Sequence, residues 1–187
     1  MTQEEWINEW AYFADNLDKI GINSLYDMNL LEEELNSSPG GLNIDSGLAY
    51  PGGLIVHINR STKIALRLAK MVSGTFTISD ESIMKCCLIM HLQKRLMFEE
   101  NDDIWQVKNR GLKYKFRQDI TSYLRCGSLS ALEALNNGVK LSTDEYEAIM
   151  SLDDREENNK NYRKPILYLI IKMANELAYA IERESRN

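Results

Sequence analysis

Apolar residues recur every three or four positions in most segments of this chain, and this spacing restricts the fold more than any other feature. In the first segment the repeating apolar positions are Trp6, Trp10, Phe13 and Leu17. Residues at this spacing share one face of an α-helix. Thr2 precedes the segment and Gly21 follows it, as the start and stop signals of a helix do. We therefore predict an amphipathic helix over residues 2–21.

The same pattern predicts further helices along the chain. One helix is expected over residues 54–73, and the next begins at Ser79 or Asp80. A third begins at Ser128 or Ser130 and ends at Gly138. Two more begin at Ser142, with Glu145 as its capping partner, and at Pro165. The stretch from Cys86 to Met90 is apolar almost all round, which indicates a central helix in which Cys86 and Cys87 pack as small apolar side chains. Amphipathic helices bury their apolar faces against one another, so we predict an all-α domain.

Residues 99–119 break the helical rhythm. Apolar and polar residues alternate there, with the apolar ones at Trp105, Val107, Leu112, Tyr114 and Phe116. This alternation predicts a small β-hairpin or extended flap. Cations gather near it, and we assign to a surface that grips phosphate or nucleic acid the residues Arg95, Lys108, Arg110, Lys113, Lys115 and Arg117. The alternative interpretation is an ordinary solvated edge of a two-stranded flap.

Composition limits the classes of function. The chain has 187 residues, enough for one domain with a sizeable core, and a net charge of −6, which argues against a protein that mainly coats nucleic-acid backbone. Three cysteines, two of them adjacent, do not make a disulfide framework. We expect no membrane span, because no apolar run is long enough, and a cytoplasmic location, because the first ten residues are acidic and lack a cationic leader.

A glycine- and proline-rich loop leads into the helix expected at residues 54–73. Residues 37–53 hold five of the ten glycines and two of the three prolines, so this loop turns sharply more than once. It places His57 near the start of the helix. A histidine there is a poor choice for packing and a good choice for holding a ligand.

This loop and four later segments, taken in order, resemble the HD-domain phosphohydrolase superfamily. The likeness is to small HD proteins of bacteria and phages, which are related to the HD part of certain 3′–5′ exoribonucleases. The matching segments are AYPGGLIVH (49–57), LIMHLQK (88–94), CGSLS (126–130), LSTDEYEAIMSL (141–152) and PILYLIIKMANELA (165–178). The resemblance implies an HD-like helical bundle with a small β-hairpin flap over residues 41–187, preceded by an N-terminal helical extension over residues 1–40. Small size and a composition rich in Asn, Lys, Ile and Glu suit a phage or mobile-element protein acting in the host cytoplasm.

In that family, histidines and aspartates from separate helices bind one or two divalent metals, and a metal-bound hydroxide attacks a phosphate. His57 and His91 match two of the histidines. The remaining family ligands are replaced in this chain by Leu92, Cys126, Asn175 and a residue near Leu152. Both carboxylates of the family site are therefore missing, and a neutral amide is a poor ligand for a hard cation.

The resemblance implies a degenerate site with no required cofactor. We expect its relic pocket to contain His57, His91, Asn175, Cys126 and Lys94. We interpret the protein as one that binds a nucleotide, a nucleic acid or a protein partner, which could be a second copy of itself. The alternative is an active phosphohydrolase that holds Mn, Ni, Co or Zn with His57 and His91, helped by the substitute carboxylates Asp153 or Asp154.

Two further features have competing interpretations. Cys126 lies at a helix start beside Arg125, which could lower a thiol pKa, but no partner histidine or carboxylate is near in sequence, so a structural cysteine is favoured. Trp6, Trp10 and Phe13 could form a docking face for a partner chain, and packing across the core is the favoured interpretation.

Overall fold

The computed structural model describes residues 2–25, 34–120, 125–153 and 163–184. In chain order its labelled elements are α1 (Gln3–Ile20), η1 (Asn23–Leu25), η2 (Ile44–Ser46), α3 (Gly53–Val72), α4 (Asp80–Ile89), η3 (Leu92–Leu96), β1 (Phe98–Glu100), α5 (Ile104–Arg110), β2 (Tyr114–Phe116), α6 (Cys126–Asn136), α7 (Thr143–Met150) and α8 (Ile166–Glu184). The fold is helical apart from one small antiparallel sheet, which confirms the predicted class. None of the helices in these ranges has both the length and the apolar composition that a bilayer crossing requires.

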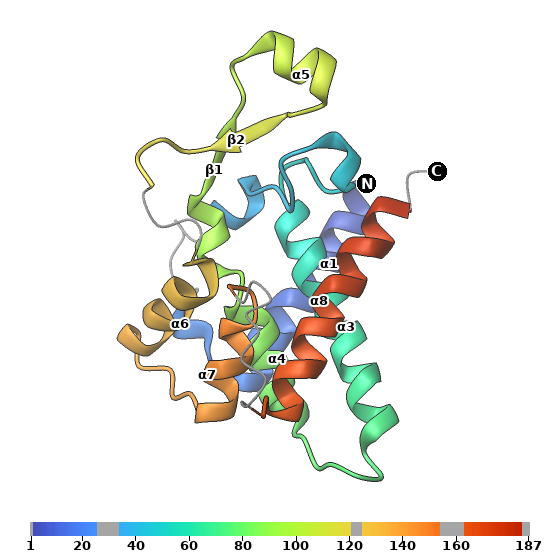
Figure 1. The fold of residues 1–187 in the computed structure, drawn as a ribbon, viewed down its shortest axis with the longest axis vertical. Coiled ribbons are helices and arrows are strands. Elements are labelled where there is room, and N and C mark those ends of the chain that lie inside the picture. Colours follow the sequence, from blue (N-terminus) through green and yellow to red (C-terminus); the bar gives the residue numbers. More distant parts are fainter. Residues whose placement is uncertain (1, 26–33, 121–124, 154–162, 185–187) are drawn as a thin grey trace.

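Helix α4 lies at the centre of the bundle. It packs against α1, α3, α6, α7 and α8, and Figure 1 shows it enclosed by these helices. Cys86 and Cys87 on α4 are fully buried in the apolar core. The expected central helix and the packing role of its two cysteines are therefore confirmed.

Helix α1 has both of its predicted ends. The Thr2 hydroxyl accepts a hydrogen bond from the backbone N–H of Glu5, and the Glu5 carboxylate accepts one from the backbone of Thr2. Gly21 ends the helix in the left-handed conformation. Phe13 is fully buried, and Trp6 and Trp10 pack half-buried against the core, which confirms the packing interpretation of these three residues.

The predicted small hairpin is present, and a short helix interrupts it. Strands β1 and β2 pair with Phe98 opposite Phe116, but a short helix, α5, lies between them at the far end of the flap (Figure 1). The alternating pattern at Trp105 was therefore wrongly interpreted as extended. The physical reason is a local cap, because the Asp103 carboxylate accepts hydrogen bonds from the backbone N–H groups of the next turn and Gly111 ends it at φ 62°.

Helix α6 begins at Cys126, earlier than either predicted serine start. Its cap comes from a distant residue, because the Asp153 carboxylate accepts hydrogen bonds from the backbone N–H groups of Gly127 and Ser128, at 2.9 and 2.7 Å. A cap supplied 25 residues away leaves no local pattern in the sequence. The expected starts at Ser79 and at Ser142 are confirmed.

The loop before α3 depends on close backbone packing at Gly53. A Cβ atom there would lie 2.3 Å from the Leu48 carbonyl oxygen and 2.9 Å from the Gly40 nitrogen. The preceding Gly52 has φ 79°, a conformation that favours glycine. The loop therefore sets the start of α3, and with it the position of His57 along the helix.

We predict that Gly53→Ala destabilises the protein, because the added methyl group collides with backbone atoms that cannot move aside. The free energy of unfolding, measured by urea denaturation, is expected to fall by about 2 kcal/mol or more. Gly74→Ala is the control, because nothing lies within 4 Å of its added Cβ. Equal stability of the two variants would contradict the close packing of this loop.

Candidate functional site

His57 is fully buried and both of its ring nitrogens contact oxygen atoms. Nδ1 lies 3.0 and 2.9 Å from the two carboxylate oxygens of Glu182, and Nε2 lies 2.9 Å from Oδ1 of Asn175. The carboxylate and the amide oxygen, both on α8, contact the two ring nitrogens from opposite sides and so fix the orientation of the buried imidazole.

His91 meets the same asparagine from the opposite side. His91 lies two residues after the last residue of α4, and its Nε2 lies 2.9 Å from Asn175 Oδ1. The rings of His57 and His91 are 4.8 Å apart, edge to face. One amide oxygen on α8 therefore joins α3 to the end of α4, and three residues of the predicted pocket come together there.

Burial and neighbouring charges change the electrostatics of His91. Burial, and then the positive charges of Lys94 and His57, lower the pKa of His91 well below its ordinary value. His91 is therefore the neutral tautomer with hydrogen on Nε2, and its buried Nδ1 has no hydrogen-bond partner among the described residues. The site thus contains a neutral, buried His91 imidazole next to the ring of His57.

Glu182 and Arg60 were not identified from the sequence. The Arg60 guanidinium lies 3.1 Å from the Glu182 carboxylate and reaches toward solvent, whereas Glu182 itself is fully buried. The spacing of Glu182 and Arg60 along their helices indicated that both belong to the site. Glu182 follows Asn175 by seven residues, and Arg60 follows His57 by three, so each lies on the face of its helix that the predicted residue occupies.

Tyr179 connects His57 to Lys94. The Tyr179 ring stacks on His57 at 4.1 Å between ring centres, and the Lys94 ammonium donates to the Tyr179 hydroxyl. Burial by itself lowers the pKa of Lys94, but Tyr179, Cys126 and Glu182 outweigh burial and raise it. Lys94 therefore stays positively charged at neutral pH inside a partly buried site.

A pocket of about 340 Å³ opens beside Lys94. Its wall contains two loop glycines, one cation, one carboxylate, three aromatic rings and several apolar side chains, namely Gly40, Gly41, Leu42, Lys94, Met97, Phe98, Phe116, Cys126, Leu152, Asp153 and Tyr179. Phe98 and Phe116 belong to β1 and β2, so the base of the flap forms one side of the pocket.

Cys126 lines this pocket without the properties of a nucleophile. Burial raises the pKa of its thiol to about 11, against the opposing effect of the Lys94 charge. The thiol is therefore protonated at neutral pH. This agrees with the structural interpretation made from the sequence.

The residues at His57 and His91 fit a divalent metal poorly. Each Nε2 donates a hydrogen to Asn175, whereas a metal ligand must present a lone pair. Leu92 is fully buried and has no donor atom. Within the described part of the chain, no three His, Cys, Asp or Glu side chains converge as a metal-binding group. Asp153 is engaged at the start of α6, and Asp154 lies outside the described residues.

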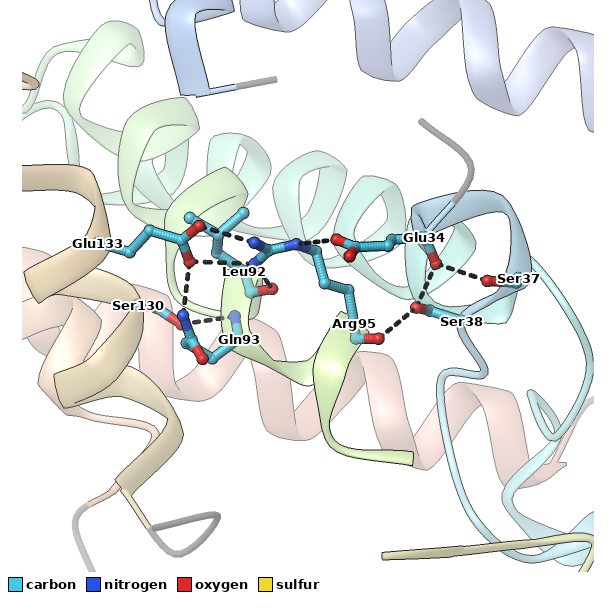
Figure 2. A network of polar contacts seen from close by, with 8 residues as sticks. All are labelled: Glu34, Ser37, Ser38, Leu92, Gln93, Arg95, Ser130 and Glu133. Atoms are coloured by element: carbon cyan, nitrogen blue, oxygen red, sulfur yellow. Dashed lines mark hydrogen bonds and ion pairs between the residues drawn. The ribbon is translucent and has the colours of Figure 1, made fainter. Parts of the chain in front are cut away.

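Arg95 does not belong to the flap, which corrects its assignment to the phosphate-gripping surface. It lies in η3, and its guanidinium binds the carboxylates of Glu34 and Glu133 at 2.8 and 2.7 Å (Figure 2). Its NH1 also donates to the backbone carbonyl of Leu92. Arg95 therefore fastens α6 and the segment before the glycine loop to the centre of the fold.

The remaining flap cations divide into two groups. Lys115 pairs with Asp102 and Glu99, and Arg117 pairs with Asp119, so their charges are compensated locally. In the part of the chain that the structure describes, no carboxylate pairs with Lys108, Arg110 or Lys113. Arg110 lies over the Trp105 ring, and Lys113 lies over the Tyr114 ring.

No family model matches this chain, and neither does any curated protein or solved structure in the comparisons. The likeness to HD proteins therefore rests on the five ordered sequence segments. His57, His91 and Asn175 lie in three of these segments, and the structure brings the three side chains together.

We predict that the protein becomes less stable as the pH is lowered below about 6.5. The reason is that the unfolded chain takes up a proton at His91, whereas the folded chain excludes that proton. Above that pH both states leave His91 neutral and its contribution is constant. The slope from this residue is up to about 1.4 kcal/mol per pH unit. Urea denaturation between pH 7.5 and 5.5 measures it.

The matched variant for this prediction is His91→Gln, which removes the titrating group. Its stability should depend less on pH over the same range than that of the wild type. The chain has only two histidines, so few other groups titrate there. Parallel curves for the two proteins would contradict a neutral, buried His91.

Proposed function

We propose that this chain is an HD-like protein that binds a nucleotide and no longer hydrolyses phosphoesters. The observation that carries the proposal is the single Asn175 oxygen shared by His57 and His91. In an HD enzyme the corresponding position is an aspartate that binds the metal. Here a neutral amide holds the two imidazoles together by hydrogen bonds.

The loss of hydrolysis follows from the donor set. Metal-assisted attack on a phosphate needs a cation held by enough anionic or lone-pair donors to make a bound water acidic. Leu92 supplies no donor and Asn175 supplies no charge. Glu182 does supply a carboxylate, but it contacts Nδ1 of His57, on the side of the ring away from Asn175.

The pocket beside Lys94 supports a nucleotide as the ligand. Its volume of about 340 Å³ is within the range for small-molecule sites. Lys94 offers a positive charge to a phosphate, while Phe98, Phe116 and Tyr179 offer aromatic surface to a base.

An active hydrolase is the competing hypothesis, and it has weaker support. It requires a substitute carboxylate beside the two histidines. The Asp153 carboxylate accepts hydrogen bonds from Gly127 and from both the backbone and the hydroxyl of Ser128. Releasing it would leave the first turn of α6 without its cap.

We predict that the purified wild type retains no stoichiometric Mn, Ni, Co or Zn after desalting, because two imidazoles alone hold such ions weakly. Asn175→Asp should gain metal, since it returns a carboxylate to the point between the two rings. Asn137→Asp, at the exposed end of α6, is the control and should gain none. Metal content is measured by elemental analysis. Stoichiometric metal in the wild type that His57→Ala abolishes, with metal-dependent cleavage of a phosphate ester, would overturn the proposal.

We also predict that nucleoside phosphates bind the wild type and that Lys94→Gln weakens binding about tenfold, through loss of a charge-assisted contact. Isothermal titration with a panel of nucleoside mono- and triphosphates measures the affinity. Lys70→Gln, an exposed lysine at the end of α3, is the matched control and should bind like the wild type. Equal affinities of the Lys94 and Lys70 variants would contradict this site.

A further inference from the structure

The C-terminal helix α8 has an apolar stripe on its outer surface. Leu169, Met173 and Leu177 follow one another at intervals of four residues and are 43%, 51% and 42% exposed. Side chains four residues apart lie in one continuous row along a helix. Three large apolar residues in one exposed row are more than the scattered surface leucines of an ordinary monomer.

The opposite face of α8 is fully used by the fold. Ile170, Ile171, Ala174 and Ala178 are buried, and the helix packs against α3, α4 and α7. Figure 1 shows α8 running along the outside of the bundle over most of its length. The stripe is therefore on the side of α8 that these three helices do not cover.

We propose that this stripe packs against the same stripe of a second copy of the chain, with the two α8 helices antiparallel about a two-fold axis level with Asn175. This arrangement places Met173 of one copy opposite Leu177 of the other, twice. Rows of residues at intervals of four interdigitate with an identical row at a crossing angle near −50°. A two-fold interface of this type is self-complementary by construction.

Charge complementarity favours a second copy over an unrelated partner. Lys172 and Glu176 lie on the same flank of the stripe, one turn apart. A two-fold axis perpendicular to the helices brings this flank against itself with the direction reversed. Lys172 of one copy is then level with Ala178 of the other, two residues or about 3 Å along the helix from Glu176, which is within reach of the long lysine side chain, and this approach occurs on both sides of the axis.

The local charge also permits two acidic chains to approach here. The chain carries a net charge of −6. On the outer part of α8, Lys172 and Arg183 balance Glu176 and Glu184, so this surface has no net charge. Association at this face therefore avoids the general repulsion between two copies.

Analytical ultracentrifugation of the full chain at increasing concentration tests the proposal. We expect the wild type to form a dimer, and Met173→Glu to weaken its self-association about tenfold or more by placing a charge at the centre of the interface. Met71→Glu is the matched control. Met71 is 81% exposed on α3, away from the stripe, and its variant should dimerise like the wild type.

A charge exchange gives a second readout that does not depend on the core of the interface. Lys172→Glu alone and Glu176→Lys alone should each weaken the dimer, because like charges then face each other across the axis. The double exchange should restore it. Both positions are on the surface of α8, so circular dichroism should show unchanged helix content in all variants.

The proposal is overturned if the wild type stays monomeric throughout the concentration range. It is also overturned if the Met173→Glu and Met71→Glu variants dimerise with equal affinity. The same holds if the double charge exchange does not restore the dimerisation affinity that each single charge change reduces. None of these outcomes depends on nucleotide or metal binding, so the dimer and the proposed function can fail independently.

Discussion

The fold of this protein depends on one amide oxygen. Asn175 Oδ1 accepts hydrogen bonds from His57 and His91, and so ties α8 to α3 and to the end of α4 at the centre of the bundle. Buried donors left without an acceptor cost about 1–3 kcal/mol each, so removing this oxygen exposes two such penalties at once. The Glu182 carboxylate completes the arrangement, because both of its oxygens contact Nδ1 of His57 and both side chains are fully buried.

A metal ion would join the same three helices by a different interaction. In the family that the sequence resembles, a cation attracts imidazole lone pairs and carboxylates, whereas here an acceptor oxygen attracts imidazole hydrogens. The two solutions require similar positions for the two histidines but opposite protonation at the nitrogens that face the centre. Replacing an aspartate by asparagine therefore preserves the geometry of such a centre and changes its chemistry.

Local signals predicted most of the fold, and contacts between distant residues explain the failures. The helices and the caps at Thr2 and Ser142 followed from spacing and capping chemistry that lie within a few residues. The predicted start of α6 was wrong because the residue that caps this helix, Asp153, is far along the chain. Within the site, His57, His91 and Asn175 were expected together. Glu182 was missed because a lone glutamate near a chain end is ordinarily solvated.

The register of the flap strands separates the two ends of the flap in character. Phe98 and Phe116 are paired at its base, where both form the wall of the pocket, and α5 lies at the opposite end. The paired strands are the connection between these two ends. The flap therefore presents two different surfaces: its base closes one side of the pocket, while its tip offers the exposed indole of Trp105 to solvent.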